Sequence, residues 1–257
     1  MKGLKSFIVA HFRYAARVPW STFLSFLVSV TFSIVITLQI FFTYRITQFP
    51  FPELSFDMFL LCFFMNQVIF FVGLALGVGN VVKFCRTLIA GGIDIMLLRP
   101  VPMVFFMFAR KIRVDHVLMM FIYFILFFIQ SIRVGFGASD IFMMFLYCLL
   151  SGTLYILIVT IFNAIGCLLR NVDNIQRVST NIDEFLQNRP AEIFPKPVQL
   201  FFTFVIPQMF IGSYIFDLVR HRNTVFIWVM LITWVVILSF VNQRLWRRIL
   251  KNYESIG

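Results

Sequence analysis

The sequence predicts an all-α, polytopic membrane protein with six transmembrane helices. Its composition is 61% hydrophobic and 13% charged, whereas about a quarter of the residues in a soluble protein are charged. The mean hydropathy is +0.93. The apolar residues gather in blocks of about 20, which is the helix length that crosses a hydrocarbon core of about 30 Å. We therefore interpret residues 1–257 as a single transmembrane domain.

Residues 1–21 have the pattern of an amphipathic helix that lies on the membrane surface. Basic side chains and apolar side chains alternate there at helical spacing, with Lys2, Lys5, Arg13 and Arg17 in the first set and Leu4, Phe7, Ile8, Phe12 and Ala15 in the second. A cleaved signal peptide is the competing interpretation. It fits less well, because the apolar run that follows is too long and lacks a small-residue cleavage site.

Six apolar segments are long enough to be membrane spans. The expected spans are residues 22–44, 57–82, 116–132, 141–169, 198–219 and 224–241. In the second span, Gly73 and Gly77 are four residues apart, a spacing that can let another helix approach closely. In the fifth span, Pro207 removes one backbone hydrogen bond and can kink or break the helix.

The polar stretch 170–197 predicts a second surface helix between the fourth and fifth spans. Apolar residues recur on one helical face and prolines follow them: the apolar residues are Ile175, Val178, Ile182 and Phe185, and the prolines are Pro190, Pro195 and Pro197. Because proline cannot continue a helix, this surface helix should end before residue 190.

Residues 83–113 form the most basic segment outside the predicted spans. Gly91 and Gly92 predict a turn, and a short apolar run from Ile93 to Leu98 follows. Asp94 can cap the start of that short helix, a contribution of about 0.5–2 kcal/mol. Pro100 and Pro102 end it, because proline also disfavours helical geometry in the residue before it. We expect a helix, a sharp break and a second helix along the membrane.

The distribution of basic residues predicts the orientation of the chain. With both termini in the cytoplasm, 18 of the 22 Lys and Arg residues fall on the cytoplasmic side. The positive-inside rule therefore favours that orientation. The net charge of +11 is better explained by lipid head groups and topology than by nucleic acid, because apolar blocks separate the basic residues.

The sequence has no pattern typical of a catalytic or metal site. Its four cysteines include no CxxC pair, and its three histidines are far apart. A phosphate-binding loop of the GxxxxGK[S/T] type, an HExxH motif and a Ser/His/Asp set are all absent from the sequence. We expect neither an enzyme with its own ATPase site nor a bound cofactor.

None of the predicted spans carries an ionisable residue away from its ends, since Asp57, His116 and Asp217 are all close to span boundaries. Ion-coupled carriers need such groups at depth, where an acid costs about 2.5–3.5 kcal/mol to insert. Their absence argues against a secondary transporter and favours an external source of energy.

Residues 91–102, GGIDIMLLRPVP, resemble the G-x-(I/L)-D-x-x-L-L-R-P stretch of bacterial permease subunits of type-2 ATP-binding-cassette (ABC) exporters. The tail, RLWRRILKNYESIG, is similar to the end of those proteins, which closes on Tyr-x-Ser-x-Gly. The segment VIPQMFIGSYIF resembles an "I-P" pair that precedes an outer re-entrant piece in the family. Relatives often have proline after the tyrosine of that piece, where this chain has Ile215.

The resemblance implies a permease in the bacterial cytoplasmic membrane, in contact with membrane lipids. It would export an unidentified amphipathic or lipid-like substrate, using ATP that a separate ABC ATPase subunit hydrolyses. A second permease subunit, identical or a sister chain, would complete the transporter. The residues expected to form the cytoplasmic coupling helix that touches the ATPase are Asp94, Leu97, Leu98, Arg99, Pro100 and Pro102. The alternative is a non-transporting membrane scaffold or assembly factor, and a neighbouring gene for a phosphate-loop ATPase would distinguish the two.

Overall fold

The computed structural model describes residues 19–47, 54–75, 77–93 and 114–252. Across these ranges the chain is almost entirely helical. The longer helices are α2 (Pro19–Thr47), α3 (Phe56–Ala75), α4 (Val78–Ile89), α7 (Val114–Val134), α8 (Ala138–Leu168), α9 (Val172–Leu186) and α12 (Thr224–Lys251). The shorter ones are η1 (Ala191–Ile193), α10 (Lys196–Phe204), η2 (Gln208–Phe210) and α11 (Tyr214–Val219). Most of the predicted surface helix 1–21 lies outside the described residues.

Four helical segments of the described chain are long and apolar enough to cross a membrane: Phe56–Ile89, Val114–Val134, Ala138–Leu168 and Thr224–Lys251. They correspond to the second, third, fourth and sixth predicted spans. Helix α2 covers the first predicted span and contains a shorter apolar stretch, Phe23–Leu38. The chain is therefore a polytopic helical membrane protein.

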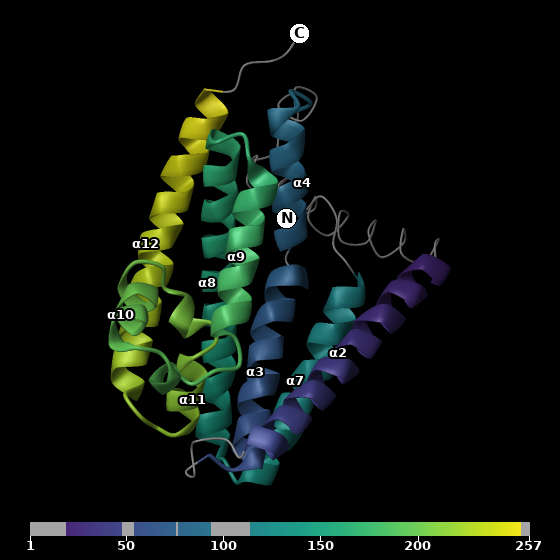
Figure 1. Cartoon of the computed structure of the whole chain (residues 1–257), viewed down its shortest axis with the longest axis vertical. Helices are drawn as coiled ribbons and strands as arrows, with labels where there is room; N and C mark the ends of the chain where they lie inside the picture. The colour runs from purple at the N-terminus through teal and green to yellow at the C-terminus, as the bar shows by residue number, and fades with distance from the viewer. Residues whose placement is uncertain (1–18, 48–53, 76, 94–113, 253–257) are drawn as a thin grey trace.

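Helix α3 lies at the centre of the bundle and α12 at its edge. Figure 1 shows α3 between α7 and the α8–α9 pair, while α12 packs along the far side of α8. The most apolar part of the α3–α4 span is 82% buried, whereas that of α12 is only 11% buried. The unburied apolar face of α12 is available to lipid.

The two glycines of the second predicted span have different tasks. A Cβ on Gly73 would overlap the ring of Tyr155, so this glycine lets α3 and α8 approach closely. Gly77 instead precedes α4 with φ at 100°, a conformation that favours glycine, and so redirects the chain between α3 and α4.

The structure corrects the predicted fifth span. Residues 198–219 do not form one helix but parts of three short ones, α10, η2 and α11. The helix is interrupted at Pro207, between α10 and η2. Proline has no N–H to donate within the helix, and its ring crowds the preceding turn. Residues 190–219 are called the broken segment below.

The structure also corrects the location of residues 170–197. Arg170, with φ at 51°, and a hydrogen bond from Asn171 N to Gly166 O at 2.9 Å reverse the chain after α8. Helix α9 then runs back alongside α8 (Figure 1). Beyond its end, Asn188 is 3.1 Å from the side chain of Asn66, deep within α3. The helix was predicted correctly, but the segment does not stay at one surface.

Candidate functional site

The residues predicted to form the coupling helix lie outside the described residues, so their role stays a prediction. They are Asp94, Leu97, Leu98, Arg99, Pro100 and Pro102. The described range 77–93 ends just before them, at Ile93. Ile93 is fully buried in a small apolar cluster with Phe84 and Trp246. The rings of Phe84 and Trp246 are 5.8 Å apart between centroids. This packing connects the start of the predicted coupling segment to α4 and α12.

An ion pair joins the same end of α4 to α9. The guanidinium of Arg86 donates through Nε and Nη2 to Oδ1 of Asp173, at 3.0 and 2.6 Å. Both side chains are about 60% exposed, so this pair contributes little to stability, about 0–1 kcal/mol. It nevertheless gives α9 a polar contact close to the predicted coupling segment.

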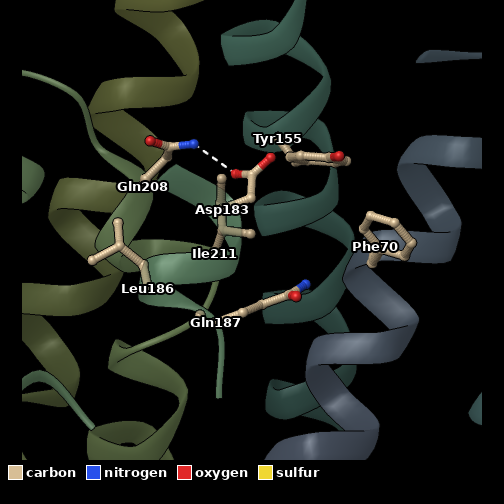
Figure 2. Close-up of a pocket in the computed structure, with 8 residues that line it drawn as sticks. Phe70, Tyr155, Asp183, Leu186, Gln187, Gln208 and Ile211 are labelled. Atoms are coloured by element: carbon tan, nitrogen blue, oxygen red, sulfur yellow. Dashed lines mark hydrogen bonds between the residues drawn. The ribbon is translucent and has the colours of Figure 1, made fainter. Parts of the chain in front are cut away.

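Deeper in the bundle, α9 carries Asp183 toward the broken segment. Oδ1 of Asp183 accepts a hydrogen bond of 2.6 Å from Nε2 of Gln208. Figure 2 shows the carboxylate pointing toward Gln208 and Tyr155, with Phe70 on the opposite wall. The small cavity there is lined by Phe70, Tyr155, Asp183, Leu186, Gln187, Gln208, Ile211 and Gly212.

The residues around Asp183 show how far along the membrane-spanning helices it lies. Tyr155 is 13 residues before the end of α8 at Leu168, which is roughly 20 Å at 1.5 Å per residue. Phe70 lies similarly far from the start of α3. Asp183 is thus level with the middle of two candidate membrane spans, where an ionisable side chain is expensive and usually functional.

Gln208 offers a free acceptor at this cavity. Its side chain is 99% buried, and its Oε1 has no hydrogen-bond partner within the described part of the chain. A buried acceptor without a partner is unfavourable. The cavity has room for about one water molecule. A water or a polar group of a ligand could therefore be bound between Gln208 and Asp183.

Side-chain hydrogen bonds connect the backbone of the broken segment to α8, and the broken segment to the backbone of α9. The carbonyl of Phe210 accepts hydrogen bonds from the hydroxyls of Tyr147, at 2.5 Å, and Ser151, at 3.0 Å. Ser213 donates its hydroxyl to Leu186 O at 3.2 Å. A Cβ on Gly212 would be 3.1 Å from that same oxygen, so glycine permits this close approach. Irregular backbone at membrane depth requires such partners.

A partly buried ion-pair network holds the end of the broken segment. Arg220, whose side chain is only 6% exposed, contacts Asp217 at 3.0 Å and Glu192 at 3.1 Å. Arg222 contacts the other oxygen of Glu192 at 2.9 Å. The network therefore joins η1, α11 and the turn before α12.

The sequence did not reveal Asp183, because residues 170–197 were interpreted as a surface helix. The predicted spans themselves carry no ionisable residue away from their ends, but Asp183 of α9 lies level with two of them. The argument against ion coupling therefore no longer stands. One signal was present: Ser179, Asp183 and Leu186 share a helical face, and Ser179 and Leu186 are both buried. The apolar set Val178 and Phe185 is the more exposed one.

The described residues contain no group of three or more His, Cys, Asp or Glu side chains that could hold a metal ion. The cysteines are all buried and free.

Comparison with known proteins identifies the family. The model of the ABC-2 family transporter protein matches residues 53–257, most of the chain. The chain therefore belongs to the ABC-2 transporter family, as the motif at residues 91–102 suggested. No curated protein and no solved structure matches it. The family defines a membrane permease of an ABC transporter, which in general associates with an ABC ATPase.

Proposed function

We propose that this chain is the permease subunit of an ATP-driven exporter that moves an amphipathic or lipid-like substrate out of the bacterial cytoplasm. The observation that carries the proposal is the family match over residues 53–257. The permease would act as a dimer, with itself or with a sister chain, above two ATPase subunits. An interior that combines aromatic walls with Asp183 and Gln208 suits a substrate with both apolar and polar parts.

The described contacts supply a route along which ATPase movement would reach the membrane interior. Ile93, next to the predicted coupling helix, packs on α4 and α12. Arg86 pairs α4 with α9 through Asp173. Further along α9, Asp183 is hydrogen-bonded to Gln208 of the broken segment. A displacement of residues 94–102 would thus be passed to α9 and from α9 to the broken segment.

The orientation with both termini in the cytoplasm is part of the proposal. Because α9 runs away from the end of α8, Arg189 and Lys196 are left out of the count for the side of the termini, which still has 16 of the 22 basic residues. A single cysteine at Asn223 should react with an impermeant thiol reagent on intact cells, and one at Asn252 should not. The reverse pattern would overturn the orientation.

Reconstitution tests the function. The chain would be purified with its co-purifying ATPase and placed in vesicles containing a fluorescently labelled phospholipid as the probe. Movement of the probe should require ATP and should persist when the proton gradient is collapsed while ATP is maintained. The control is the same complex with the phosphate-loop lysine of the ATPase replaced. Movement driven by an ion gradient without the ATPase would contradict the proposal, and an intact complex that moves no probe would favour a scaffold.

A further inference from the structure

Two contacts, one near each end of α2, attach this helix to the rest of the bundle. Near its start, the hydroxyl of Ser25 donates to Oδ2 of Asp115 in α7 at 2.8 Å. Near its end, the ring of Phe41 meets that of Phe56 edge to face, with centroids 5.4 Å apart. Figure 1 shows α2 lying obliquely across α7. The stretch between these two contacts faces α7 and Phe64 of α3.

A cavity of about 310 Å³ lies beneath that stretch. Its lining comes from three helices: Val30, Ser33, Ile34, Thr37 and Leu38 of α2, Phe64 of α3, and Met119, Ile122, Tyr123 and Leu126 of α7. The lining surface is almost wholly apolar. Its few hydroxyl groups are those of Ser33, Thr37 and Tyr123, and the hydroxyl of Thr37 donates to the backbone carbonyl of Ser33 at 2.8 Å. They therefore offer little to a bound water molecule.

The size and chemistry of the cavity restrict what can occupy it. Protein interiors are close-packed, so an empty space of this size would forfeit many van der Waals contacts. An apolar cavity does not hold water well. A helix is about 10–12 Å across and would not fit. At roughly 30 Å³ per methylene, close to the volume of a water molecule, about ten carbons of an alkyl chain would fit.

The cavity opens toward the surface of the bundle. Ile34 and Leu38, which line it, are 54% and 50% exposed, and Ile122 on α7 is 37% exposed. These side chains belong to helices whose outer faces are apolar, with Ile125 and Ile129 of α7 also exposed. The mouth of the cavity is therefore continuous with the face that meets the hydrocarbon core.

We propose that this cavity binds one acyl chain of a bilayer phospholipid, wedged between α2, α3 and α7. The acyl chain fills the space beneath α2, between the contacts at Ser25 and Phe41. It thereby sets the distance of α2 from α3. This inference depends on the membrane location of these helices and not on transport, so it can fail or hold independently of the proposed function.

The test uses a phospholipid with a photoreactive diazirine in one acyl chain, with the purified full-length chain reconstituted in vesicles. After illumination, peptide mapping should find the label on the cavity-lining residues of α2 and α7. Ile34→Trp fills the cavity and should lower this labelling about fivefold or more, corresponding to about 1 kcal/mol of lost affinity. Val35→Trp is the matched control, since Val35 is equally exposed, at 55%, but does not line the cavity.

Val30→Phe fills the same cavity from another position and should have the same effect as Ile34→Trp, which guards against a folding defect in either variant. Equal labelling of both faces of α2, or loss of labelling in Val35→Trp as large as in Ile34→Trp, would show only surrounding bilayer lipid and overturn the proposal. Lipid label on the exposed faces of α2 and α7 with none on the cavity-lining residues would also overturn it.

Discussion

Helix α12 and the broken segment are of comparable length, yet one is a single helix and the other is four short ones. In α12 every interior N–H can bond within the helix, and only a narrow stripe of its surface is buried. The broken segment has its backbone interrupted by prolines, and its Phe210 carbonyl accepts hydrogen bonds from Tyr147 and Ser151 of α8. Its shape is therefore set by side chains of other elements.

The two kinds of structure differ in how easily their contacts can change. Helices α3 and α8 touch closely at Gly73 and Tyr155, where no exchange of partners is available. The broken segment packs apolar side chains such as Phe210, Ile215 and Phe216 into the core, and it adds polar contacts to α8 and α9. Only those polar contacts could find other partners if α9 moved. An ABC permease needs both properties, because it must keep its fold while its path through the membrane changes.

The largest expected effect is at the ion-pair network of the broken segment. Arg220→Met should lower the free energy of unfolding by about 3–5 kcal/mol, because it leaves the buried Asp217 without Arg220. Thermal unfolding in detergent would measure it. Arg133→Met is the control, since its contact with Asp57 is 3.6 Å long and both side chains are exposed. That change should cost about 0–1 kcal/mol. Equal losses in the two variants would mean that the network is not what holds the segment.

Gly73→Leu should disrupt the packing of α3 against α8. The new side chain would overlap the Tyr155 ring, so we expect the free energy of unfolding to fall by about 2–3 kcal/mol from overpacking. Gly79→Leu is the matched control, because a Cβ there has no other described atom within 4 Å. Unfolding of both variants would be followed by the same thermal assay. A Gly79 variant as unstable as the Gly73 variant would argue against close α3–α8 packing.

A smaller loss of stability is expected at the contact between α9 and the broken segment. Asp183→Leu removes the acceptor of the Gln208 amide and should cost about 1–2 kcal/mol. Adding Gln208→Leu should restore most of the stability, since no polar atom is then left without a partner. If the pair also takes part in transport, the double variant should be stable but inactive. A double variant with normal probe movement in vesicles would reduce the contact to a structural one.

Sequence patterns predicted those parts of the fold whose structure is local. Long apolar blocks became long helices, and the prolines after residue 189 ended α9 near where they were expected to. The motif at residues 91–102 also led to the correct family. These features depend on backbone and solvent preferences that each segment carries by itself.

The features that were missed depend on contacts between distant segments. Whether α9 lies on the surface or against α8 is decided by the reversal at Arg170 and by Asn163, whose amide donates to Gln176 Oε1 at 2.9 Å. Charge and periodicity in residues 170–197 are compatible with both locations. Likewise, Gln208, which is hydrogen-bonded to Asp183, is 25 residues further along the chain, with four prolines in between. The coupling residues Asp94 to Pro102 remain a prediction from the motif.

The most direct test of the central claim is whether residues 94–102 join the permease to its ATPase. Asp94→Ala, and Pro100→Ala together with Pro102→Ala, would be compared with Arg45→Ala, using pull-down of the ATPase and ATP hydrolysis by the complex at matched expression. Removal of the prolines would let the helix run on and displace Leu98 and Arg99. We predict that the first two variants insert normally but lose the ATPase or its stimulated hydrolysis, whereas Arg45→Ala keeps both. Undiminished ATPase binding and hydrolysis in the Asp94 and proline variants would contradict the claim.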